Sequence, residues 1–227
     1  METTVWLLRH AETEGTAKGL YCSRREMAVN CKGLQQERLL AERLQSRRVG
    51  AVYASPLSRC VSLAGLIARE HAVEVIEAPE LMEMNLGRWD GLRRSEIARR
   101  FSVPYAAWQG DPAGNAPDGG ESGYSVAARV VPFLLRLGVR HVGRNIVVVS
   151  HKAVNRIVLC HFLNVPLSEY RRRIPQGIAA FNELVFSTDG SARVTILNDT
   201  SHLAAMPQRM QDAQFDFQAR GSSPRRL

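Results

Sequence analysis

The chain has 227 residues, of which 45% are hydrophobic, so it is long enough to bury one substantial core and is not of the disordered or fibrous class. No apolar run reaches the length of a membrane span, and residues 5–8 are too short an apolar stretch for a signal peptide, so a cytoplasmic protein is expected. The formal net charge is +8, but the arginine clusters are scattered without an aromatic platform, so no nucleic-acid partner is expected.

Hydrophobic periodicity predicts strands and helices that alternate along most of the chain. The expected elements are a strand at 4–9, helix at 33–48, strand at 50–55, helix at 55–70, strand at 73–78, helix at 94–101, loop at 111–120, helix at 121–139, strand at 145–150, helix at 151–163, and a hairpin of strands at 182–187 and 193–198. Ser55 and Ser150 suit the N-caps of the helices that follow them, and Pro132 should kink or break its helix.

This alternation predicts an α/β fold, a three-layer sandwich with a mostly parallel central sheet and helices on both faces. We expect one domain over residues 1–205 and a flexible basic tail over 206–227. The four cysteines lack the paired spacing of zinc or redox motifs, so reduced thiols are expected at Cys22, Cys31, Cys60 and Cys160.

Candidate functional residues follow three of the predicted strands. Arg9 and His10 end the first strand, Arg59 lies in the first turn of the helix after the second, and His151 follows the strand at 145–150. Ligands of open parallel sheets bind at the carboxyl ends of the strands, where helix N-termini favour anions. Each residue alone is more simply structural or solvated, but two arginines and two histidines at one edge repel one another unless an anion such as a phosphoryl group lies between them.

The residues that carry these groups belong to motifs of a known family. The sequence contains, in order, "LLRHAETEG", "SPLSRCVSLA", "LMEMNLGRWDGL", "PDGGESGYSVAARV" and "VVVSHKAVNRIVL". Together these motifs resemble the histidine phosphatase superfamily, which has the phosphoglycerate mutase-like fold, over nearly all of residues 4–200. Within it the chain is most similar to the group of α-ribazole phosphatases and broad-specificity phosphatases.

The resemblance implies a role for each matching residue. His10 would be the nucleophile, and Arg9, Arg59 and His151 would bind the phosphoryl oxygens. Glu83 would be the general acid and base, because its spacing to the following glycine and tryptophan fits better than that of Glu80. No metal or other cofactor is implied.

Two further positions depart from the family pattern and are candidate substrate-binding residues. Thr16 replaces an asparagine and can still donate one hydrogen bond. Lys152 replaces a glycine, and it either adds a positive charge to the pocket or is a surface lysine.

The predicted function is therefore that of a metal-independent phosphomonoesterase, a phosphoric monoester hydrolase that acts through a phosphohistidine on a small phosphate ester. The resemblance suggests α-ribazole 5′-phosphate as the substrate, although "EMAVNCKG" departs from the pattern of that group. The alternatives are a cofactor-dependent phosphotransferase of the phosphoglycerate mutase type and a non-catalytic scaffold that binds phosphorylated ligands. The expected partner is the small ester, with no membrane; a homodimer is left open.

Overall fold

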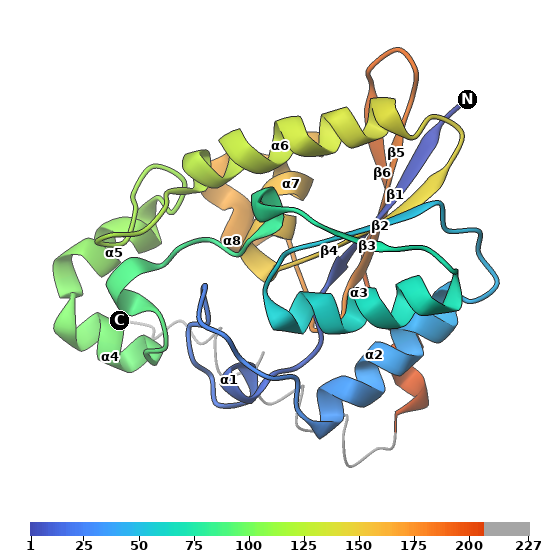
Figure 1. Cartoon of the computed structure of the whole chain (residues 1–227). Coiled ribbons are helices and arrows are strands. Elements are labelled where there is room, and N and C mark those ends of the chain that lie inside the picture. Colours follow the sequence, from blue (N-terminus) through green and yellow to red (C-terminus); the bar gives the residue numbers. More distant parts are fainter. Residues whose placement is uncertain (207–227) are drawn as a thin grey trace.

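The computed structural model describes residues 1–206, which build a single six-stranded sheet in the order β3-β2-β4-β1-β5-β6 (Figure 1). The strands are β1 (Thr3–Arg9), β2 (Ala51–Ala54), β3 (Val75–Glu77), β4 (Asn145–Ser150), β5 (Phe181–Phe186) and β6 (Ala192–Asp199). The first four pair in parallel, β5 pairs antiparallel with β1, and β5 and β6 form the predicted hairpin. The predicted mostly parallel sheet is confirmed.

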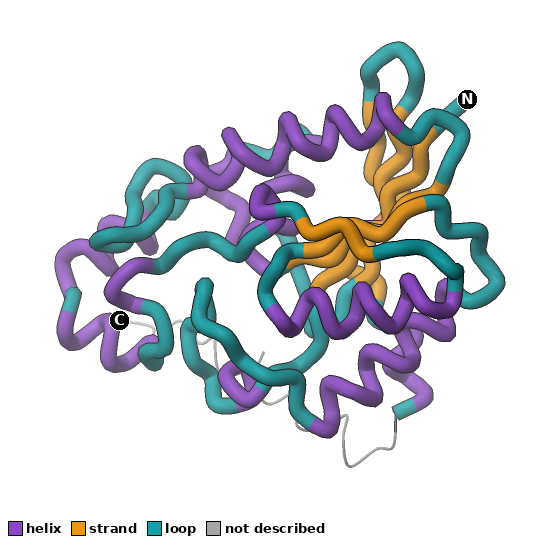
Figure 2. Tube along the Cα trace, viewed as in Figure 1, coloured by secondary structure: helices purple, strands orange, loops and turns teal. Residues whose placement is uncertain are grey.

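Helices cover both faces of this sheet (Figure 2). They are α1 (Glu14–Ala17), α2 (Cys31–Leu44), α3 (Ser58–Glu70), α4 (Arg94–Arg100), α5 (Ser102–Gly110), α6 (Gly123–Arg140), α7 (Lys152–Phe162) and α8 (Tyr170–Arg173). Short 3₁₀ helices lie at Pro79–Leu81, Gly87–Trp89, Leu167–Glu169 and Ser201–Ala205.

Side chains of β1 alternate between two buried clusters, as the pleat of a strand requires. Val5 and Leu7 pack with residues of α6 and α7, whereas Trp6 and Leu8 pack with residues of α2 and α3. The sheet is thus the middle layer of three, which confirms the predicted α/β sandwich. None of the helices in residues 1–206 is long and apolar enough to cross a membrane.

Several predicted boundaries are wrong for identifiable reasons. Helix α3 begins at Ser58 rather than 55: Leu57 occupies the N-cap position, and the Ser55 hydroxyl bonds to the ring of His151 and to the N–H of Leu57. Ser150 does not cap α7; its hydroxyl donates to the carbonyl of Leu81, and His151 occupies the N-cap position. Helix α2 ends at Leu44, four residues earlier than predicted, where the chain turns toward β2.

Two helices differ from the prediction more widely. Helix α5 occupies residues 102–110, for which no element was predicted, and Pro104 in its first turn is compatible with a helix start. Helix α6 runs through Pro132 without the break that its sequence suggests. Pro132 and Ala128 both lie on the exposed side of α6, so water can reach the carbonyl that loses its N–H partner.

The predicted thiols are free at all four cysteine positions. The predicted basic tail, 206–227, lies outside the described residues except for Met206, which is buried against the core of α2 and α3.

Two glycines in helices should respond to alanine in opposite directions. A Cβ at Gly138 of α6 would lie 2.6 Å from the ring of Phe186, whereas nothing lies within 4 Å of a Cβ at Gly65 of α3. We expect Gly138→Ala to lower the free energy of unfolding by about 1–3 kcal/mol through overpacking. Gly65→Ala should raise it by about 1 kcal/mol, because alanine is the better helix former. Urea denaturation of both variants checks this, and equal shifts of the same sign would contradict it.

Candidate active site

The carboxyl ends of three neighbouring strands bring the predicted residues to one edge of the sheet. Arg9 is the last residue of β1 and lies in register with Ser150 at the end of β4. His10 and His151 follow directly, and their ring centroids are 5.2 Å apart. Arg59 enters from the first turn of α3, which follows β2. All four side chains are buried.

Hydrogen bonding determines which nitrogen of His10 is free to react. Its Nδ1 lies 2.7 Å from the carbonyl oxygen of Ala11. Since a carbonyl can only accept, Nδ1 carries the hydrogen and Nε2 keeps its lone pair. Burial, followed by the charges of Arg59 and Arg9, holds the pKa of His10 well below its usual range. The ring is therefore neutral near pH 7, as a nucleophile must be.

Backbone carbonyls hold the two guanidinium groups in place. Arg9 donates from Nη1 to the carbonyl of Gln176 at 2.8 Å. Arg59 donates from Nη2 to the carbonyl of Ser23 at 2.6 Å and from Nη1 to that of Arg25 at 3.1 Å. The Nε–H groups of Arg9 and Arg59 are buried and have no partner among the described residues. Buried donors of this kind are rare, and the oxygens of a phosphoryl group would satisfy them.

His151 is fully buried at the end of β4. Its Nε2 lies 2.7 Å from Ser55 Oγ and 3.4 Å from Cys60 Sγ. Burial is also the largest cause that holds the pKa of His151 well below its usual range, followed by the charge of Arg59. Ser55 and Cys60 thus orient a second neutral imidazole toward the same edge.

Glu83 reaches this edge from the loop between the 3₁₀ helices Pro79–Leu81 and Gly87–Trp89. Its side chain is buried, with Oε2 accepting from the N–H of Ala153 at 3.3 Å and Oε1 from that of Met84 at 2.8 Å. The first of these bonds places the carboxylate at the start of α7, beside His151.

Helix α6 fixes the loop that carries Glu83. Arg129 donates to the carbonyls of Glu80 and Glu83, and it also pairs with Glu121. Glu121 accepts in turn from the N–H of Asn85 at 2.8 Å. Neither Arg129 nor Glu121 was singled out from the sequence, since their spacing is that of an ordinary polar helix start.

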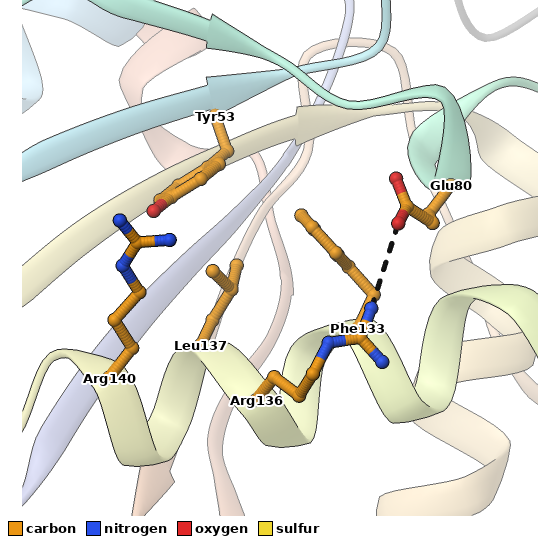
Figure 3. Close-up of a pocket in the computed structure, with 6 residues that line it drawn as sticks. All are labelled: Tyr53, Glu80, Phe133, Arg136, Leu137 and Arg140. Atoms are coloured by element: carbon orange, nitrogen blue, oxygen red, sulfur yellow. Dashed lines mark ion pairs between the residues drawn. The ribbon is translucent and has the colours of Figure 1, made fainter.

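Glu80, the rival of Glu83, faces a different part of the molecule. It lines a cavity of about 260 Å³ between β2 and α6, together with Tyr53, Phe133, Arg136, Leu137 and Arg140. Figure 3 shows the Glu80 carboxylate directed at Arg136, with which it pairs at 3.6 Å. None of the four strand-end residues lines this cavity.

The two candidate substrate-binding residues lie in different settings. The hydroxyl of Thr16 donates to the carbonyl of Thr13 and accepts from its N–H, so it is already engaged in capping α1. Lys152 is half-buried rather than a surface side chain. Burial and the charge of Arg9 lower the pKa of Lys152 to about 7.

Gln176 is a further residue that sequence reasoning missed. Its carbonyl receives Arg9, and its side chain contacts Asn155 and Asn182 in a buried amide network. Its surroundings, "RIPQGIAA", carry no pattern that points to a site. Within residues 1–206, His, Cys, Asp and Glu side chains form no group of three that could hold a metal ion.

Comparisons with known proteins identify the family to which the chain is similar. The family model "Histidine phosphatase superfamily (branch 1)" matches residues 5–200. Phosphoserine phosphatase 1 of Hydrogenobacter thermophilus is 34% identical over 164 residues, which cover 72% of this chain and 78% of that protein. Adenosylcobalamin/alpha-ribazole phosphatase of Salmonella typhimurium is 29% identical, over 86% of this chain and 95% of that protein. The solved structure of Bacillus stearothermophilus YhfR superposes with a TM-score of 0.83 at 24% identity, over 88% of this chain and 99% of that one.

The buried neutral His10 should make folding sensitive to acid. In the unfolded chain His10 takes up a proton near pH 6.5, whereas in the folded chain it stays neutral. The free energy of unfolding therefore falls as the pH drops below that value. We expect His10→Asn to remove up to about 1.4 kcal/mol per pH unit of this slope. Urea denaturation at pH 7, 6 and 5 measures it, with exposed His161→Asn as the control. Parallel pH profiles for wild type and His10→Asn would contradict the assignment.

Proposed function

Since the chain belongs to the histidine phosphatase superfamily, we propose that it hydrolyses a small phosphate ester, without a metal, through a phosphohistidine at His10. The family and its phosphatase-named relatives confirm the predicted class, a phosphoric monoester hydrolase. The observation that carries the mechanism is a neutral imidazole with a free Nε2, set among two guanidinium groups whose buried N–H donors lack partners.

In the first step, Nε2 of His10 attacks phosphorus while the P–O bond to the leaving group breaks in line. Negative charge spreads over three equatorial oxygens as this happens. Arg9 and Arg59 stabilise that charge with donors already fixed by backbone carbonyls, so little reorganisation is needed. His151 completes the cradle in the tautomer in which Nε2 accepts from Ser55, since Nδ1 then carries an N–H that can donate to the phosphoryl group.

Glu83 acts as the general acid and then as the general base. As an acid it protonates the departing alkoxide, and as a carboxylate it then accepts a proton from the water that attacks the phosphohistidine. The P–N bond breaks, and His10 and inorganic phosphate are released. The N–H of Ala153 and the loop contacts of Arg129 keep this carboxyl at the start of α7 throughout.

The relatives supply two classes of substrate. One relative is named for phosphoserine and the other for adenosylcobalamin and alpha-ribazole compounds. We retain α-ribazole 5′-phosphate as a candidate beside phosphoserine. Specificity constants for both, with a panel of phosphosugars and phosphoglycerates, decide between them.

Substitutions at His10 and Glu83 should separate the two chemical roles. We expect His10→Ala to abolish turnover and the acid-labile adduct trapped by rapid quenching with labelled ester. Glu83→Gln should lower kcat/KM for alkyl phosphates by about 10²–10⁴-fold. It should affect p-nitrophenyl phosphate much less, because that leaving group needs no proton.

The control for this experiment is Glu80→Gln, the same change three residues away and outside the site. It should alter kcat/KM by no more than about twofold, as surface substitutions do. Assays include a chelator throughout. Wild-type protein that turns over no ester in the panel would favour the scaffold alternative, and net transfer of the phosphoryl group to a second substrate instead of water would favour the mutase type.

A further inference from the structure

The strand-end residues Arg9, His10, Arg59 and His151 are called the phosphoryl pocket below. Three cations beside it have no part in the mechanism above. Lys152 and Arg156 are four residues apart on α7, so they lie on one side of the helix. Arg171 belongs to α8, which packs against α7, as Figure 1 shows. Its guanidinium lies 4.0 Å above the ring of Trp108 in α5.

This group of cations borders the catalytic residues. Lys152 stands between His151 and Ala153, whose N–H binds Glu83. One turn along α7, Asn155 donates to the side chain of Gln176, whose carbonyl holds Arg9. Lys152 and the adjoining face of α7 therefore lie at the rim of the phosphoryl pocket.

The cations lack the counter-ions that their neighbours have. Nearby Arg24 and Arg129 share Glu121, and Arg172 pairs with Glu169. No carboxylate of the described chain pairs with Lys152, Arg156 or Arg171.

Burial makes this lack of partners costly. Arg156 has a buried Nε–H without a partner in residues 1–206, and Lys152 and Arg156 are both half-buried. Desolvation and the surrounding positive charges lower the pKa of Lys152 to about 7 and that of Arg156 to about 10. Like charges four residues apart repel on a helix, and a cation in the first turn opposes the helix dipole. This arrangement does not stabilise the folded chain, but a bound anion would neutralise the repulsion among the three cations.

We propose that Lys152, Arg156 and Arg171 form a second anion subsite, so that the preferred substrate is a phosphate monoester with another acidic group, a carboxylate or a second phosphate. This inference rests on the proposed function, since it takes the strand-end pocket as the site of the reacting phosphoryl group. It favours an acidic ester such as phosphoserine over α-ribazole 5′-phosphate, which has no second acid.

Binding to the full-length His10→Ala protein tests the subsite without turnover. Titration calorimetry compares two matched pairs: glycerol 3-phosphate with 3-phosphoglycerate, and fructose 6-phosphate with fructose 1,6-bisphosphate. We expect the ligand with the extra acid to bind at least about tenfold more tightly in one pair, and that pair identifies carboxylate or phosphate. Lys152→Gln, Arg156→Gln or Arg171→Gln, each added to His10→Ala, should reduce this ratio by about tenfold.

The control substitution is Arg47→Gln. Arg47 is an exposed arginine between α2 and β2, and its substitution should leave the ratio of Kd values unchanged. Equal Kd values within both pairs, or ratios that survive all three substitutions, would overturn the subsite. Wild-type turnover of p-nitrophenyl phosphate, measured in parallel, reports separately on the proposed function. Turnover without a binding preference would remove only the subsite, and preference without turnover would remove only the hydrolase.

Discussion

The site depends on one electrostatic constraint: positive charge is concentrated at the carboxyl edge of the sheet and is held there out of water. Arg9 and Arg59 are almost fully buried, and each is fixed by backbone carbonyls rather than by a carboxylate. Carbonyl oxygens orient a guanidinium without neutralising it, so the charge remains available. Burial, together with this charge, holds the pKa values of His10 and His151 well below their usual range, so both rings stay neutral. One arrangement thus supplies both an unprotonated nucleophile and a receptor for phosphoryl oxygens.

The fold makes this concentration of charge tolerable. Parallel strands β1, β4 and β2 deliver residues from distant parts of the sequence to one edge, and the register of Arg9 with Ser150 sets His10 beside His151. The buried hydrophobic clusters on both faces of the sheet stabilise the fold and offset the repulsion between the cations at this edge. Glu83 is the exception, because it comes from a loop and needs Arg129 of α6 to hold it.

Strand-end residues were predictable because a parallel sheet places them by topology alone. Arg9, His10 and His151 stand at the ends of two apolar runs that predict buried strands, and Arg59 lies in the first turn of the helix after a third strand, at 50–55. Glu83 was different: only the family resemblance separated it from Glu80, since burial and the contact with Ala153 depend on how a loop folds back. Ser55 shows the limit from another side. Local rules favour a helix cap there, but the N-cap position falls at Leu57, and the Ser55 hydroxyl makes a tertiary hydrogen bond to His151.

Lys152 shows how a departure from a family pattern gains meaning only in three dimensions. The sequence favours a surface lysine there, because a helix start is commonly exposed. In the structure Lys152 is half-buried among arginines. A glycine at this position would avoid both the desolvation of the ammonium group and its repulsion by the arginines. A residue that the fold does not need, in a place where its charge is unfavourable, is best explained by what binds there. The positive field then extends from the phosphoryl pocket along α7 to α8, and that extension is suited to a ligand with two separated negative groups rather than one.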